Sequence, residues 1–172
     1  MRLPLLLALS LLAMPSIAQE LHESMQPYEY LVGQWEGPAW YLTPTGQRVD
    51  VVQTEDVYAG AGGHIIVVQG TGYLRQADGT PGEAAFNAFG VMSHDAAAGG
   101  HFVDAFNEGR HIRTAVTPTD GGFEWAFEAG GRRVRYVMHL DDDGRWVETG
   151  EAMIGPESWV QFVEMTLSRV GE

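Results

Sequence analysis

Three residues in the C-terminal third of the chain could carry acid–base or ligand-binding chemistry: Tyr136, Glu148 and Glu151. They flank a turn, and the length of that turn decides which glutamate shares a strand face with Tyr136. A loop of residues 143–144 places Glu151 on that face, whereas a loop of residues 142–144 places Glu148 there. An inward carboxyl group must be hydrogen-bonded, hydrated or raised in pKa. The inward glutamate is therefore a candidate ligand contact, and a hydrated carboxyl is the alternative.

Composition excludes much other chemistry. The sequence has no cysteine and no lysine, which removes thiol nucleophiles, disulfides, cysteine-ligated zinc and Schiff-base chemistry. Its six histidines show none of the sequence motifs typical of metal sites, and residues 141–144 lack the later glutamate of an EF-hand loop. We therefore expect no metal site and no cofactor.

Charge narrows the range of partners. The 172 residues carry a formal net charge of −13, so nucleic-acid backbones and anionic membrane surfaces would repel the chain. With 45% hydrophobic residues the chain can bury a core, and its length is typical of one domain. We expect a small-molecule ligand and no nucleic-acid partner.

The first eighteen residues are typical of a secretory signal peptide. A basic start precedes the apolar run 3–14, and small residues follow at a cleavage site. Because the apolar run is too short to span ~30 Å of hydrocarbon, we expect an exported protein, periplasmic or secreted, with no membrane span in its mature chain. The predicted parts are a signal peptide at 1–18, an N-terminal segment with helical character at 19–29, and one domain at 30–172.

Turns rich in glycine and proline divide the remaining chain into ten segments that are rich in Val, Thr and aromatic residues. Their polarity often alternates, as in strands with one buried face. A meander of this length leaves no exposed edge if it closes on itself. The sequence therefore predicts an all-β fold: a single ten-stranded antiparallel up-and-down barrel with a short N-terminal helix. The expected strands are 30–42, 49–59, 64–74, 84–93, 101–107, 111–117, 123–128, 132–140, 145–153 and 158–170.

A pair of glycines at residues 130–131 sets the register of one hairpin. As a two-residue turn, it places Trp125 opposite Tyr136 and Phe127 opposite Val134 on an apolar inner face. The same register sends the three arginines that follow the turn outward, next to glutamates. An internal anion clamp is the alternative role for these arginines.

The sequence Gly33-Gln34-Trp35 in the first expected strand, together with Arg169 near the end of the last, resembles the Gly-x-Trp and terminal-arginine pair of the calycin barrels. This resemblance implies that Trp35 closes one end of the barrel and that Arg169 stacks across it. Over residues 28–170 the chain is most similar to an uncharacterised family of bacterial lipocalin-like proteins. That family implies a lipocalin-like fold and no particular activity.

The longer pattern at residues 33–37 also resembles the haem-binding nitrobindins, which hold iron through a histidine on the C-terminal strand. The present sequence has no histidine after His139. Gln161 and Phe162 occupy the stretch where that ligand would be expected. Haem binding is therefore less favoured than binding of another small molecule.

Together these patterns favour a protein that holds a small amphipathic or apolar molecule inside a barrel. The alternatives are an enzyme of the same fold that uses an interior Glu/Tyr pair, and a ligand-free structural or interaction barrel filled by its own aromatic residues. No catalytic residue is assigned. The structural residues are Gly33, Trp35 and Arg169, and the candidate ligand-binding residues are Trp35, Tyr41, Trp125, Phe127, Tyr136, Met138, Glu148, Glu151, Gln161 and Met165.

We predict that the exported protein starts near Gln19 and folds without metal or disulfide. N-terminal sequencing of exported material should therefore begin near Gln19, and EDTA should leave the thermal unfolding midpoint unchanged. Met1 retained on exported protein, or unfolding by EDTA, would contradict this prediction.

Overall fold

The computed structural model describes residues 19–156 and 158–171. The predicted signal peptide, residues 1–18, lies outside the described residues. A short 3-10 helix, η1 (Gln26–Leu31), precedes the strands. The strands are β1 (Gly33–Leu42), β2 (Arg48–Gly60), β3 (Ile65–Arg75), β4 (Pro81–Asp95), β5 (Gly100–Asn107), β6 (Arg110–Thr119), β7 (Gly122–Ala129), β8 (Arg132–Leu140), β9 (Trp146–Gly155) and β10 (Ser158–Val170), with the 3-10 helix η2 (Ala61–Gly63) between β2 and β3.

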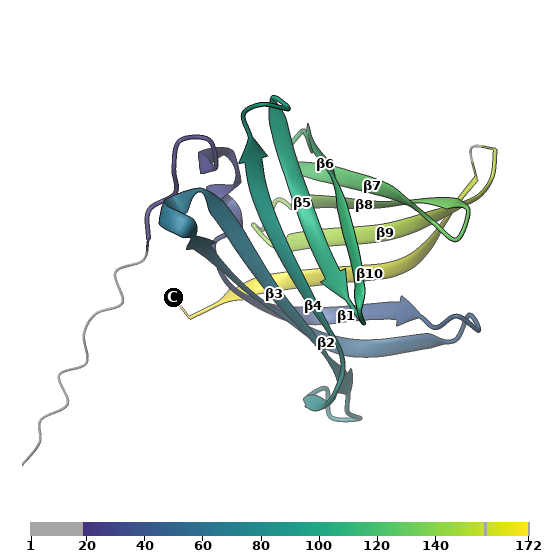
Figure 1. Cartoon of the computed structure of the whole chain (residues 1–172). Helices are drawn as coiled ribbons and strands as arrows, with labels where there is room; N and C mark the ends of the chain where they lie inside the picture. Colours follow the sequence, from purple (N-terminus) through teal and green to yellow (C-terminus); the bar gives the residue numbers. More distant parts are fainter. Residues whose placement is uncertain (1–18, 157, 172) are drawn as a thin grey trace, which may run out of the picture.

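The strands form one closed barrel (Figure 1). Each strand pairs antiparallel with the next, and β10 returns to pair with β1. The predicted ten-stranded barrel is therefore confirmed. The N-terminal helix is a 3-10 helix of six residues with a proline at its start, and β1 begins after it at Gly33. Among the described residues, no helix has the length and apolarity needed to cross a membrane.

The β7–β8 hairpin has the predicted register. Both glycines of the turn have positive φ, 57° and 73°, as a type I′ turn requires. Trp125 lies opposite Tyr136 and Phe127 opposite Val134. On the outer face, Arg135 forms an ion pair with Glu151 at 2.7 Å. This pairing confirms the outward placement of Arg135, whereas Arg132, opposite Ala129 at the turn, lies on the same strand face as the inward Val134.

The seam between β6 and β7 is short. The two strands pair over four positions, from Val116 opposite Trp125 to Thr119 opposite Gly122. Beyond them, the Thr114 hydroxyl donates a hydrogen bond of 2.6 Å to the backbone carbonyl of residue 126. The first half of β6 is therefore held mainly by its pairing with β5.

The N-terminal segment closes one end of the barrel (Figure 1). Met25, Tyr28 and Leu31 are buried there in one cluster with inward side chains of the strands. Trp35 is 1% exposed, and its Nε1 donates a 2.8 Å hydrogen bond to the carbonyl of Leu31. Apolar packing and this hydrogen bond fix η1 across the barrel end.

Arg169 secures the same end from the C-terminal strand. Its guanidinium carbon lies 4.2 Å from the centroid of the Trp35 ring, which confirms the predicted contact. The guanidinium also donates hydrogen bonds to the backbone carbonyls of Tyr30 and Val32. A Cβ at Gly33 would lie 2.4 Å from Arg169 Nη1, and the φ of this residue is +140°. Glycine is therefore required at the first position of the Gly-x-Trp pattern.

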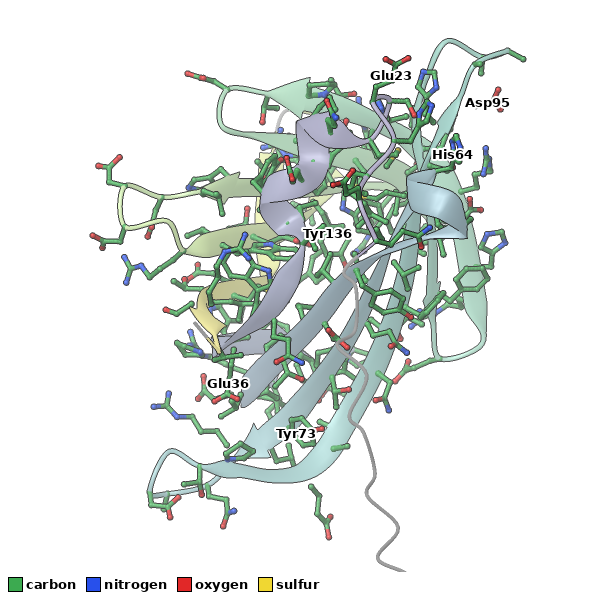
Figure 2. The ribbon with its side chains drawn as sticks, turned by 90° about the vertical axis from the view of Figure 1, so that its left-hand side faces the viewer. Glu23, Glu36, His64, Tyr73, Asp95 and Tyr136 are labelled. Carbon is green, nitrogen blue, oxygen red and sulfur yellow. The ribbon has the colours of Figure 1, made fainter. Side chains whose placement is uncertain are left out.

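The described part of the chain leaves the opposite end uncovered (Figure 1). Inward side chains near the closed end, such as Met138 and Leu167, are fully buried. Those nearer the uncovered end, including Tyr41, Phe127 and Tyr136, point inward but remain only half-buried. Figure 2 shows Tyr136 within the outline of the barrel. The interior is thus packed at one end and accessible at the other.

We predict that Trp35→Ala lowers the free energy of unfolding by roughly 3–5 kcal/mol, because it removes a fully buried large side chain. Trp40→Ala is the matched control, since Trp40 lies on the outer face beneath the exposed Arg48. Urea unfolding should show a clearly smaller loss for the control. Equal losses for the two variants would contradict the role assigned to Trp35.

Candidate functional site

The β8–β9 turn brings one of the two candidate glutamates into the barrel. Its loop is residues 142–144, because the amide of Asp141 donates to the carbonyl of Arg145. In this register Glu148 pairs with the inward residue Met138. Glu151 lies on the outer face, where it is bound by an arginine of β8. The alternative register, which places Glu151 on the inner wall, is therefore wrong, because the third loop residue shifts the strand by one position.

A β-bulge in β10 changes the predicted lining. Met165 and Val163 point inward, and a regular strand would send Gln161 inward as well. The bulge between Gln161 and Val163 reverses the alternation. Gln161 therefore lies on the outer face and donates a 2.6 Å hydrogen bond to Glu164. Its predicted place in the interior lining is wrong, and Phe162 occupies the interior instead, edge-on to an aromatic ring of β8.

A second interior carboxyl, Glu55 on β2, was not among the predicted site residues. Glu55 is 7% exposed and Gln53 is 3% exposed, and Gln53 Nε2 donates a 2.8 Å hydrogen bond to Glu55 Oε1. A Cβ at Gly70 on β3 would lie 2.6 Å from the same oxygen, so glycine leaves room for the carboxyl group. The alternation with the buried Val51 and Val57 is the sequence signal that identifies both polar residues as inward-facing.

Burial strongly perturbs both interior carboxyl groups. The pKa of Glu55 is raised to about 8, mainly by desolvation and also by the nearby charge of Glu148, while the hydrogen bond from Gln53 lowers it. Desolvation also raises the pKa of Glu148 to about 7, against a 3.1 Å hydrogen bond from Trp146 Nε1. The two carboxyl groups are therefore electrostatically coupled inside the barrel.

Stacked aromatic rings form one wall above these carboxyl groups. The rings of Trp125 and Tyr136 are nearly parallel, 7° apart, with centroids separated by 4.4 Å. Phe127 stacks on Trp125 at 5.6 Å. Burial raises the pKa of Tyr136, as does the charge of Glu148, whereas Arg110 opposes this effect. The wall thus combines flat apolar faces with one buried hydroxyl group.

The facing wall is also aromatic. Tyr41 of β1 packs edge-on to Phe86 of β4, with centroids 5.4 Å apart. A Cβ at Gly72 would lie 2.3 Å from the Phe86 ring, so this glycine makes space for it. Met165 lies between the walls, paired with Glu148 across β9 and β10.

The structure therefore sorts the predicted lining residues into three groups. Trp35 and Met138 belong to the fully buried core at the closed end. Glu151 and Gln161 lie on the outer face. The interior beyond that core holds Tyr41, Trp125, Phe127, Tyr136, Glu148 and Met165, together with Gln53, Glu55, Phe86 and Phe162, which were not predicted. Gln53 and Glu55 are buried there.

The histidines lie away from this interior. His101 Nε2 donates a hydrogen bond to the carbonyl of Ser24 at the closed end, and His111 stacks on Phe106 outside the barrel. The described stretch of β10 carries no histidine. No group of three or more metal-ligating side chains occurs in residues 19–156 and 158–171. The donor set present here does not fit a histidine-ligated haem.

A separate groove of about 390 Å³ opens on the outer face. It lies between β3, β4 and the turn that joins β5 to β6. Phe89 and Phe106, whose ring centroids are 6.2 Å apart, line it and point away from the barrel interior. Neither Glu55 nor Glu148, the two interior acids, lines this groove.

Comparison with known proteins supports the fold. No model of a known protein family matches the chain, and no curated protein matches its sequence. Among solved structures, the crystal structure of Rv2717c from M. tuberculosis is similar, with a TM-score of 0.63 and 12% sequence identity. The match covers 87% of this chain and 99% of that chain. This likeness shows the fold alone, a closed antiparallel barrel of ten strands.

We predict that Glu55→Gln stabilises the protein in a pH-dependent way. The native pKa of Glu55 is about 8, above its ordinary value of 4.5, so native protein binds this proton more tightly than unfolded protein does. The stabilising effect of this proton is fully present at low pH and is lost as pH rises toward 8. The substitution should therefore raise the thermal midpoint more at pH 9 than at pH 5.

Glu124→Gln is the control for this comparison, because Glu124 lies on β7 between the inward residues Phe123 and Trp125 and so points outward. Its thermal midpoint should follow that of the parent protein across the same pH range. A gain for Glu55→Gln that is equal at pH 5 and pH 9 would show that the native carboxyl is not perturbed.

Proposed function

We propose that this protein is an exported, lipocalin-like binding protein that holds a small amphipathic molecule inside its barrel. The observation that carries the proposal is the stacked wall of Trp125, Phe127 and Tyr136, which faces inward and remains partly accessible. Aromatic faces left accessible inside a barrel are typical of ligand sites, because a guest molecule completes their burial.

We infer an amphipathic ligand because the polar side chains of the interior lie deeper in the barrel than its aromatic wall. Flat apolar surface lies at the wall, whereas Glu55, Gln53 and Glu148 lie between that wall and the packed closed end. Burial of the apolar part provides most of the favourable free energy. The polar group of the ligand then replaces water at the carboxyl groups and sets its orientation.

Export is supported by the sequence alone. Residues 1–18 have the basic start, apolar run and small residues of a cleavable signal. A chain without cysteine needs no disulfide formation outside the cytoplasm, so its barrel relies on packing and strand pairing. An exported ligand carrier is consistent with both features.

An enzyme of the same fold is the second candidate function. It is favoured by the pKa of Glu148, about 7, and by the nearby half-buried Tyr136, whose hydroxyl group lies within reach of the Glu148 charge. A carboxyl group that titrates near neutral pH suits general acid–base chemistry. Native mass spectrometry of protein purified from its source distinguishes the two functions: a binding protein releases its ligand unchanged, and an enzyme converts it.

We predict that the neutral fluorophore N-phenylnaphthylamine binds in the interior and that Tyr136→Leu weakens this binding about tenfold, because stacking surface is lost. Fluorescence titration measures the dissociation constant. Phe106→Leu is the matched control, since Phe106 is an aromatic residue on the outer face, stacked on His111. It should bind the fluorophore as the parent protein does.

Two results would contradict the binding proposal. The fluorophore could fail to bind the parent protein at all, in which case the ligand-free barrel becomes the better description. Equal weakening by Tyr136→Leu and Phe106→Leu would place the fluorophore outside the barrel, in the groove beside Phe106.

A further inference from the structure

The deep polar groups of the barrel interior are dominated by hydrogen-bond acceptors. Glu55 and Glu148 each receive one hydrogen bond, from Gln53 Nε2 and Trp146 Nε1 respectively. Neither carboxyl takes part in an ion pair with any residue in the described part of the chain. A buried acid without a cationic partner is unfavourable once it ionises.

The two carboxyl groups converge around one tryptophan pair. Glu55 is the direct neighbour of Trp35 across β1 and β2. The Trp35 and Trp146 rings meet edge-to-face with centroids 5.7 Å apart, and Glu148 accepts the hydrogen bond of Trp146. Each acid is therefore next to one ring of the tryptophan pair at the closed end, and the charge of Glu148 acts on Glu55.

Gln53 supplies an independent observation that points to a ligand. Its side chain is 97% buried, and its Oε1 atom has no hydrogen-bond partner. Its Nε2 atom is held by Glu55, which fixes the amide beside the carboxyl group. Buried acceptors without a partner are rare in folded proteins and costly. A donor from a bound molecule would satisfy this atom.

We propose that the interior site selects organic cations, namely molecules that join a flat apolar ring to a protonated primary amine, with the ammonium group held by Glu55, Glu148 and Gln53. The inference rests on the proposed binding function and names its ligand class. A primary ammonium has three N–H donors and no acceptor, which matches the three acceptors of the site.

Other ligand charges fit the site less well. A carboxylate or phosphate would be repelled by the two acids and would offer no donor to Gln53 Oε1. A neutral alcohol has one donor and leaves the acids uncompensated. An ammonium group also gains from the faces of Trp125 and Tyr136, the stacked rings of the wall.

The charged surroundings of the site predict a pH dependence. Glu55 and Glu148 act on each other, and Glu148 also acts on Tyr136. Arg110, which is exposed and paired with Glu108, is the cation that acts on Tyr136 from the uncovered end. The pKa values of the two acids, about 8 and about 7, mean that both ionise as pH rises above neutral. Amine binding should strengthen over that range.

The test uses three competitors that share a naphthalene ring: naphthylethylamine, which is a cation, naphthylethanol, which is neutral, and naphthylacetate, which is an anion. Each displaces N-phenylnaphthylamine from the protein, and the dissociation constants are compared. At pH 8 the amine should bind at least about tenfold more tightly than the alcohol, and the acetate should bind most weakly. At pH 6 the advantage of the amine should shrink.

Substitutions of Glu55 and Glu148 test whether these two acids cause the preference for the amine over the alcohol. Glu148→Gln and Glu55→Gln keep the shape of each side chain and should bring the amine and alcohol dissociation constants within about twofold of each other. Glu124→Gln, on the outer face, should keep the tenfold ratio. A far-ultraviolet circular dichroism spectrum that matches that of the parent protein, together with cooperative thermal unfolding, shows that each variant has folded with its barrel intact.

The outcomes separate this inference from the proposed function. Binding of N-phenylnaphthylamine with equal competition by amine and alcohol would overturn the cation selectivity and leave the binding function standing. Preference for the acetate, or a ratio that survives in both Gln variants, would overturn it as well. Failure of N-phenylnaphthylamine and all three competitors to bind would overturn both.

Discussion

The guanidinium group of Arg169 ties together three segments that meet at one end of the barrel. It covers the ring of Trp35 and holds the backbone carbonyls of Tyr30 and Val32, so the first strand, the last strand and the N-terminal segment become one unit. The Trp35 ring also packs edge-to-face against the ring of Trp146 on β9. Because the packing is complete at this end, the barrel can leave its other end accessible.

The interior carboxyl groups oppose the stability of the fold. Burial raises the pKa of both Glu55 and Glu148, so each is held in a setting that disfavours its charged form. Well-packed apolar residues of similar size would stabilise a barrel more than two acids do. Gly70, on the neighbouring strand, leaves room for one of them, which would not be needed in a barrel filled for stability alone. Local features that reduce stability are expected at functional sites.

Much of the fold could be predicted because local signals fixed it. Ten turn-bounded segments determined the strand order, and paired glycines at residues 130–131 determined the register of β7 and β8. The choice between Glu148 and Glu151 stayed open at that stage, because it depended on whether the loop before β9 has two or three residues. The Asp141–Arg145 backbone contact decided it.

Other features of the site could not be predicted from alternation alone. The bulge in β10 inserts one residue, and no change in composition marks it, so Gln161 was placed on the wrong face. Glu55 carried a usable signal, since it alternates with buried valines on β2. Its charge made it look like a surface residue. The contact between Glu55 and Gln53 depends on the strand geometry, which composition does not show.

The short seam between β6 and β7 gives the barrel a mechanical weak point. Few backbone pairs hold these strands together, and the stacked wall of Trp125 and Phe127 begins directly beside them. Local opening of a structure starts where the fewest hydrogen bonds must break. Opening along the half of this seam that lacks backbone pairs would expose the ring faces from the side, while Val116 and Phe123, which belong to the buried core cluster, hold the other half. Exchange of the proposed ligand would then depend on β6 and β7, whereas its affinity would depend on the strands that carry the two acids.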